Sequence, residues 1–213
     1  MSEKFPESDP IPEEQEIKEI EGSSLEVDKK LDLVLVSLGE KDVAWLGSHQ
    51  IVREGCSRKE VLDTLKSEKE NIDSLLDVLD IPHQTTKEVN PGEDIPGFGI
   101  AAGKDPEKLR EFVEADQAGD DKTMGYLLGY PKTAVEAYDT DKSMNFQVFF
   151  EKELSRDERE ALLAEGVTRF LGFQPSKKHW REELEDAREK QRLIKEKAPK
   201  LYSEIMENDF YLL

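Results

Sequence analysis

Apolar residues recur every three or four positions along much of this chain, a spacing that gathers them on one face of a helix. Two capping boxes, Ser57 with Glu60 and Ser155 with Glu158, mark helix starts, because each side chain satisfies a free backbone N–H of the first turn. A long apolar seam near the C-terminus is interrupted by Pro199, which should divide it into two helices. The spacing predicts helices over residues 31–38, 57–80, 105–113, 123–128, 131–138, 155–166 and 180–205.

Short apolar runs between charged residues and glycines indicate strands rather than helices. Such runs occupy residues 42–46, 97–102, 146–150 and 167–173. Because these strands alternate with helices, we expect an α/β fold in which helices cover a small mixed sheet. Its C-terminus should be helical and pack on that sheet. A segregated α+β arrangement is the alternative.

The first 24 residues differ from the rest of the chain in being rich in Glu, Pro and Ser, with only isolated apolar residues. A segment of this composition cannot bury enough apolar surface to offset its ordering entropy, so we expect residues 1–24 to be a disordered acidic tail. Residues 13–21 are also compatible with a transient helix or a segment that folds on a partner. Residues 25–213 are expected to form a single α/β domain, because no repeat or composition break divides them.

The charge balance is strongly acidic, with 49 Asp and Glu against 30 Lys and Arg and a formal net charge of −19. Such a surface repels nucleic acid and anionic lipid, whose phosphates are bound through Lys and Arg, and it attracts a basic protein partner. Maintenance of solubility is the alternative explanation of the charge. No apolar run is long enough to span a membrane and no signal peptide is recognisable, so the predicted location is the cytoplasm.

Motifs for cofactor or metal binding are incomplete in this sequence. The glycines of residues 97–103 resemble a phosphate loop, but Phe98 stands where the first glycine is required and Asp105 where Ser or Thr is required. Cys56 is the only cysteine, and none of the three histidines has a second ligand at a recognised metal spacing. The sequence therefore predicts no cofactor and no metal.

One segment, residues 119–133, concentrates glycines, acids and tyrosines around a tight turn. If Pro131 is the first residue of a helix, the backbone N–H groups near Thr133 point outward unpaired, and Lys132 adds positive charge beside them. Tyr130, Lys132 and Thr133 are therefore the candidate residues for binding a small anion.

Two acids of the same segment are the candidate catalytic residues. Asp120 or Asp121 would act as a base, or as a metal ligand, opposite the bound anion. The structural alternative is that the glycines only build the turn, while Leu127, Leu128 and Tyr130 fill the core.

Three stretches carry recognisable motifs: Gly-Lys-Asp-Pro-Glu-Lys-Leu at 103–109, Leu-Leu-Gly-Tyr-Pro at 127–131 followed by Thr-Ala-Val-Glu-Ala-Tyr at 133–138, and His-Trp-Arg-Glu-Glu-Leu at 179–184. Over residues 95–207 the chain resembles an uncharacterised, largely archaeal family, domain of unknown function number 483. The resemblance implies an archaeal source and a compact α/β domain, without an established activity. Many members carry paired cysteines where this chain has Thr133 and Ala134, so thiol or metal chemistry does not carry over.

Two hypotheses about function follow. The first is a non-catalytic binding or regulatory protein that engages a basic macromolecular partner through its acidic surface or its tail. The second is an enzyme or ligand-binding domain for a small anionic molecule at the 119–133 turn. The acidic charge and the absence of a recognised catalytic constellation favour the first hypothesis, and the sequence leaves open whether the protein is an enzyme.

Overall fold

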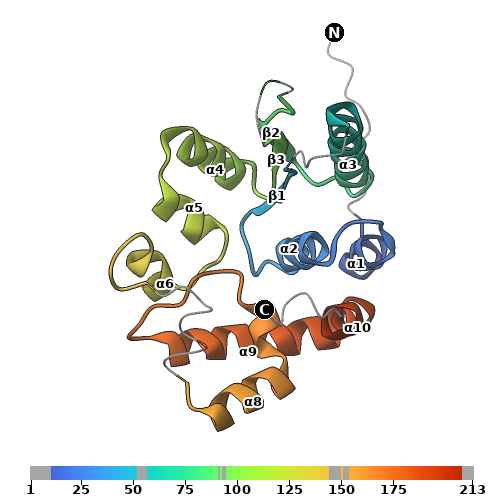
Figure 1. The fold of residues 1–213 in the computed structure, drawn as a ribbon. Helices are drawn as coiled ribbons and strands as arrows, with labels where there is room; N and C mark the ends of the chain where they lie inside the picture. The colour runs from blue at the N-terminus through green and yellow to red at the C-terminus, as the bar shows by residue number, and fades with distance from the viewer. Residues whose placement is uncertain are drawn as a thin grey trace.

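The computed structural model describes residues 11–51, 57–90, 92, 95–143, 150 and 154–207. Cys56 and, apart from Phe150, the strand expected at 146–150 lie outside these residues. In chain order the elements are α1 (Glu13–Gly22), α2 (Val27–Ser37), β1 (Ala44–His49), α3 (Arg58–Val78), β2 (His83–Lys87), β3 (Gly97–Ala102), α4 (Pro106–Ala118), α5 (Asp121–Leu127), α6 (Lys132–Ala137), α8 (Arg156–Glu165), the 3-10 helix η1 (Val167–Phe170), α9 (Trp180–Lys197) and α10 (Pro199–Glu207) (Figure 1).

Within the described residues the sheet consists of three strands in the order β1-β3-β2, and β3 pairs antiparallel with both neighbours. Ala102 of β3 lies opposite Ala44 of β1 on one side and His83 of β2 on the other. The two outer strands therefore run in the same direction, and α3 connects them. The α/β class and the helical C-terminus are confirmed. The mixed sheet is corrected to an antiparallel one, because β3 follows β2 in the chain and pairs with it directly.

The central strand β3 is buried on both faces, and its alternate residues divide between two cores. On one face Leu46, Phe98 and Ile100 join the main core with residues of α2 and α3. On the other face Val43 and Ala101 join a smaller core with α4 and α5. All of β3 is buried, so its sequence reads as a continuous apolar run.

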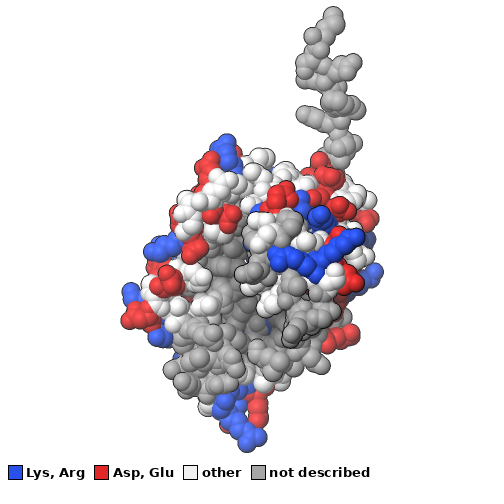
Figure 2. All heavy atoms as spheres, turned by 45° about the horizontal axis from the view of Figure 1, so that its top comes forward, with Lys and Arg blue, Asp and Glu red and all other residues white. Residues whose placement is uncertain are grey.

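Charged side chains of both signs lie next to one another on the face shown in Figure 2. Along α4, likewise, Lys108 pairs with Glu111 at 3.1 Å and Arg110 with Glu114 at 3.9 Å. Acidic side chains therefore lie among lysines and arginines both on this face and along α4.

Helix α1 corrects the expectation of a disordered tail to residue 24. Ile17 and Ile20 are buried in the main core, where α1 packs against α2. The carboxylate of Glu16, 3% exposed, accepts hydrogen bonds from the Ser37 hydroxyl at 2.6 Å and the Lys104 ammonium at 2.8 Å. A buried charge is tolerated when it is paired in this way. Partners distant in the sequence thus stabilise a segment whose composition favours disorder.

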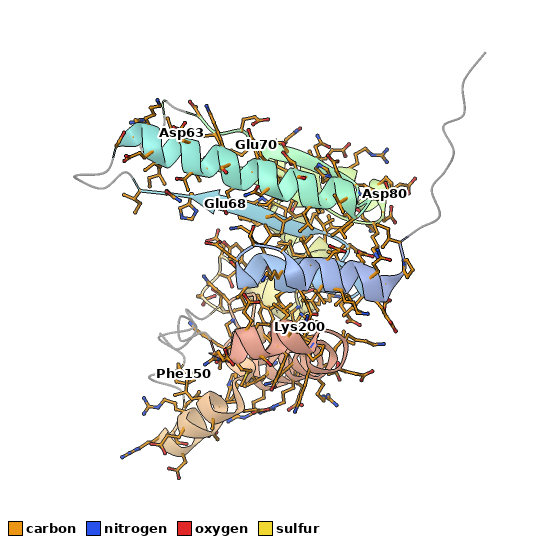
Figure 3. The ribbon with its side chains drawn as sticks, turned by 90° about the vertical axis from the view of Figure 1, so that its right-hand side faces the viewer. Asp63, Glu68, Glu70, Asp80, Phe150 and Lys200 are labelled. Atoms are coloured by element: carbon orange, nitrogen blue, oxygen red, sulfur yellow. The ribbon has the colours of Figure 1, made fainter. Side chains whose placement is uncertain are left out.

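The C-terminal third forms a layer below α1 and α2 (Figures 1 and 3). Helix α9 packs against η1 and α10, and α10 packs against α2, so the apolar seam meets other helices rather than the sheet. Its break at Pro199 is confirmed. The strand expected at 167–173 is instead the 3-10 helix η1 in its first four residues. All four residues are buried, and Arg169 of η1 donates to the carbonyl oxygens of Ile205 and Met206. These tertiary contacts override the strand propensity of the β-branched and aromatic residues in this segment.

Among the described residues, no helix is long and apolar enough to cross a membrane.

Candidate functional site

The turn between α5 and α6 has the tight geometry that its sequence indicates. Gly129 has a φ of +69°, and a Cβ there would lie 2.9 Å from the carbonyl oxygen of Glu40, so this position requires glycine. The N–H of Tyr130 donates to the carbonyl oxygen of Gly125 at 3.0 Å. Pro131 is the residue before α6 rather than its first residue. The turn therefore directs the ring of Tyr130 toward the C-terminal layer.

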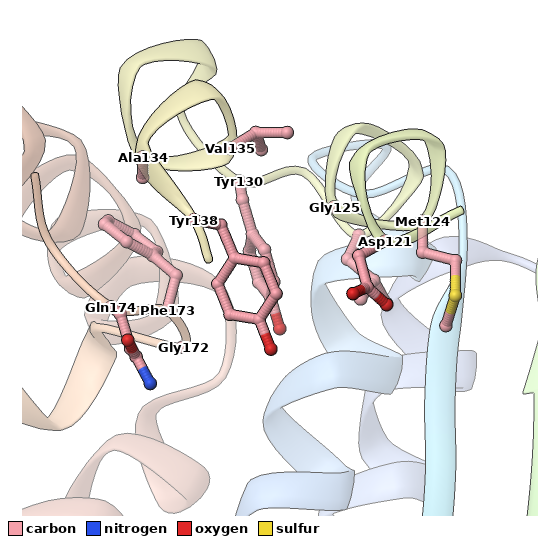
Figure 4. Close-up of a pocket in the computed structure, with 11 residues that line it drawn as sticks. Asp121, Met124, Gly125, Tyr130, Ala134, Val135, Tyr138, Gly172, Phe173 and Gln174 are labelled. Atoms are coloured by element: carbon pink, nitrogen blue, oxygen red, sulfur yellow. The ribbon is translucent and has the colours of Figure 1, made fainter. Parts of the chain in front are cut away.

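A cavity of about 360 Å³ lies between α5, α6 and residues 172–174 (Figure 4). We call it the turn cavity. Its walls are mainly apolar and aromatic, with one carboxylate and one amide among them. The lining residues are Asp121, Met124, Gly125, Leu128, Tyr130, Ala134, Val135, Tyr138, Gly172, Phe173 and Gln174.

Tyr130 lies in the middle of the lining of the turn cavity (Figure 4). Its ring centroid lies 5.7 Å from that of Phe173 at an interplanar angle of 46°, and the ammonium of Lys41 lies 5.7 Å from the Tyr130 ring. Burial raises the pKa of the Tyr130 phenol well above its usual range, and the nearby carboxylate of Asp32 and the hydroxyl of Tyr138 raise it further. Tyr130 therefore stays a neutral phenol at physiological pH and is a poor candidate for an acid or a base.

The two candidate acids of this segment have different surroundings. The carboxylate of Asp120 caps α5 and accepts hydrogen bonds from the Thr123 hydroxyl at 2.7 Å and the Thr123 N–H at 3.2 Å. These bonds lower the pKa of Asp120, with the hydroxyl making the largest contribution. Asp120 is thus an ionised helix cap outside the lining of the turn cavity. Asp121 lines the cavity, and Figure 4 places its carboxylate across from the tyrosines.

Lys132 and Thr133 do not line the turn cavity. The Lys132 side chain is 76% exposed, and its ammonium lies 3.7 Å from the carboxylate of Glu136. The hydroxyl of Thr133 donates to Glu183 at 2.6 Å, and the second carboxylate oxygen of Glu183 accepts the Ser176 N–H at 2.8 Å. Glu183 is 1% exposed. The carboxylate of Glu183 therefore accepts a hydrogen bond from Thr133 near the start of α6, the place where the sequence predicted a bound small anion.

Several residues of the site have no signal in the sequence. Tyr138 and Phe173 come from segments that are far apart in the chain, and both line the turn cavity. Glu183 joins α9 to the start of α6, although its position in a charged helix gives no sign of burial. Only the clustering of tyrosines and glycines around the turn pointed to this region.

The described residues contain no group of three or more His, Cys, Asp or Glu side chains arranged to hold a metal ion. The ring nitrogen Nδ1 of His83 lies 3.1 Å from the carbonyl oxygen of Ile81, and that of His179 lies 3.1 Å from Glu182. These two histidines thus have ordinary local partners.

No protein-family model, curated protein or solved structure matches the chain. The resemblance to the archaeal family accordingly stays a prediction.

Proposed function

We propose that this chain is a non-catalytic binding protein, and that its turn cavity accepts a large apolar side chain from a basic segment of a partner protein. The observation that carries the proposal is the cavity itself, an open hollow with aromatic walls beside a single carboxylate. Protein interfaces take most of their affinity from a few large side chains that fill such hollows.

The composition of the lining supports a protein partner. Met124, Tyr130, Tyr138 and Phe173 belong to the residue types that are enriched in the cores of protein interfaces. The volume of about 360 Å³ lies near the lower end of the range for small-molecule sites, a size suited to one anchoring side chain. A compact apolar ligand of that size is the second candidate.

The charges support a basic partner rather than an anionic ligand. Among the described residues of the lining, Asp121 alone carries a charge, and the whole chain carries a formal charge of −19. An anion entering this cavity would be repelled, whereas a basic segment would be attracted and would associate faster. The same charge underlies one further part of the proposal, which is that the chain does not bind nucleic acid directly. A cytoplasmic location also stays part of the proposal.

The surroundings of Asp120, one of the two candidate catalytic acids, support a non-catalytic role. Its carboxylate lies outside the lining of the turn cavity, and the hydrogen bonds of a helix cap lower its pKa. A general acid or base needs a pKa near the working pH, and the pKa of Asp120 is shifted away from it.

A peptide-display selection against the purified protein tests this proposal. We expect the selected peptides to combine a large apolar residue with Lys or Arg, and to bind more weakly as salt is added. The variant Gly172→Trp should weaken their binding about tenfold or more, because a side chain at this exposed position enters beside the Tyr130 ring, 3.6 Å from the new Cβ.

Gly22→Trp is the matched control, since an added Cβ at Gly22 meets no atom within 4 Å and the position lies outside the turn cavity. Equal binding of the peptides to the Gly172→Trp variant would contradict the proposal, as would a selection that yields no basic residues. Selective binding of uncharged compounds of low molecular weight in place of peptides would favour the second candidate.

A further inference from the structure

Trp45 of β1 is an exposed aromatic residue that rests on two glycines of the sheet. A Cβ at Gly47 would lie 2.2 Å from Cη2 of the indole, and one at Gly99 would lie 3.2 Å from its Nε1. Gly47 and Gly99 are partners across β1 and β3. The indole therefore covers both glycines with one face, while Trp45 as a whole is 41% exposed.

A second hollow, of about 390 Å³, lies beside this indole between α2, α4 and α5. We call it the tryptophan hollow. It is lined by Asp28, Lys29, Asp32, Trp45, Gly47, Asp116, Met124, Leu128 and Tyr130. The last three of these residues also line the turn cavity, so the two hollows adjoin.

The charges around the tryptophan hollow favour a cation. The lining includes three carboxylates, those of Asp28, Asp32 and Asp116, and one lysine. That lysine, Lys29, is 4% exposed, and its ammonium is bound by the carboxylates of Glu26 and Glu68, with 2.7 Å to the latter.

Of the three acids, Asp32 pairs with the buried ammonium of Lys41. Asp28 accepts a hydrogen bond from its neighbouring backbone, the N–H of Lys29, at 2.9 Å. Because Lys41 offsets the charge of Asp32, Asp28 and Asp116 are the two acids of the lining that supply net negative charge to the hollow.

We propose that Trp45, together with Asp28 and Asp116, binds a guanidinium group, supplied by an arginine side chain of the partner. A planar guanidinium can stack on an indole while its N–H groups donate to carboxylates, which the compact ammonium of lysine does less well. The chain contains one such contact already, because the guanidinium of Arg181 lies 4.0 Å from the ring of Trp180.

This inference rests on the proposed function and narrows the chemistry of the partner. Since Met124, Leu128 and Tyr130 separate the two hollows, one short segment can place an apolar residue in the turn cavity and an arginine over Trp45. The expected recognition element is therefore an arginine close in sequence to a large apolar residue.

The indole N–H signals in a proton–nitrogen correlation spectrum test the guanidinium site directly. The chain has two tryptophans, so Trp45 gives one signal, assigned with Trp45→Phe, and Trp180 gives an internal reference. The probes are the Nα-acetyl amides of arginine, lysine and citrulline. We expect the arginine probe to shift the Trp45 signal saturably, the lysine probe to bind about threefold to fivefold more weakly, and the neutral citrulline probe to leave the signal unchanged.

The double variant Asp28→Asn, Asp116→Asn should weaken the arginine response severalfold. Glu114→Gln, a substitution on an exposed side chain of the same helix as Asp116, should leave the response unchanged. Equal responses to arginine and citrulline, an unmoved Trp45 signal, or shifts of Trp180 as large as those of Trp45 would each overturn the inference.

The two proposals fail in different ways. The arginine probe does not need the turn cavity, so the Trp45 response should persist in Gly172→Trp. If that response is seen but no peptide binding depends on Gly172, the proposed function fails and the guanidinium site stands. If peptides bind through the turn cavity without arginine and Trp45 does not respond, the guanidinium inference fails alone.

Discussion

At the scale of single residues, Glu183 positions the candidate site from outside the turn. Its buried carboxylate accepts one hydrogen bond from Thr133 at the start of α6 and one from the backbone of Ser176. The first of these segments leads into α6, and the second follows residues 172–174, which form the opposite wall of the turn cavity. Glu183 therefore fixes the two walls relative to each other.

We expect Glu183→Ala to lower the free energy of unfolding by about 2–3 kcal/mol, because it leaves the Thr133 hydroxyl and the Ser176 N–H without their charged acceptor. Urea denaturation followed by circular dichroism measures the change. Glu189→Ala, on the exposed side of the same helix, should stay within about 0.5 kcal/mol of the wild type. A similar decrease in the free energy of unfolding in both variants would show that the Glu183 contacts contribute no more to stability than an exposed glutamate does.

At the scale of elements, α1 is an integral part of the fold. Its apolar residues are few, but Ile17 and Ile20 lie one helical turn apart and both reach the main core. At its C-terminal end the carboxylate of Glu21 accepts the N–H groups of Lys200 and Leu201, at 2.9 and 3.0 Å, and so caps the start of α10. The first and last helices described thus stabilise each other.

Ile20→Ala should therefore lower the free energy of unfolding by about 2–4 kcal/mol, the cost of a cavity at a fully buried position. The neighbouring exposed substitution Glu19→Ala should change it by less than about 0.5 kcal/mol. Thermal and chemical denaturation of the two variants measure the difference. A stable Ile20→Ala protein would mean that α1 contributes little to the domain.

At the scale of the whole molecule, carboxylates outnumber lysines and arginines and give a net charge of −19, so the long-range interaction among the charges of the folded chain is repulsive. Many of the ion pairs are exposed, such as that of Arg156 with Glu160, and pairs of this kind contribute little to stability. Salt screens both the repulsion and the attraction between exposed charges. Because repulsion is the larger of the two here, added salt should stabilise the folded state.

We expect the melting temperature to rise when sodium chloride is raised from low concentration to about 0.3 M. At this concentration the interactions between exposed charges more than about 10 Å apart are largely screened. A gain of about 1 kcal/mol corresponds to a rise of roughly 2–4 °C for a domain of this size. Potassium chloride should act equally, because screening does not depend on the identity of the cation. A melting temperature that falls with either salt would contradict this balance.

The features predicted correctly from the sequence depend on neighbouring residues. The capping boxes at Ser57 and Ser155 and the break at Pro199 are confirmed, because capping and the missing proline N–H act within one helical turn. The buried strand 97–102 is confirmed for the same reason, since an apolar run between glycine and charge is a local signal. The tight turn at residues 129–131 also depends on local information, because Gly129 has a φ of +69° and the Tyr130 N–H donates to Gly125.

What the sequence did not determine depends on contacts between distant segments. Residues 13–22 form a helix because distant partners bury their isoleucines and pair their carboxylates, and η1 is not a strand because Arg169 bonds the end of α10. The walls of the turn cavity and the tryptophan hollow likewise combine side chains from several elements. Local backbone preferences amount to about 1 kcal/mol or less per residue, whereas burial and buried hydrogen bonds amount to more, so the tertiary structure decided these features.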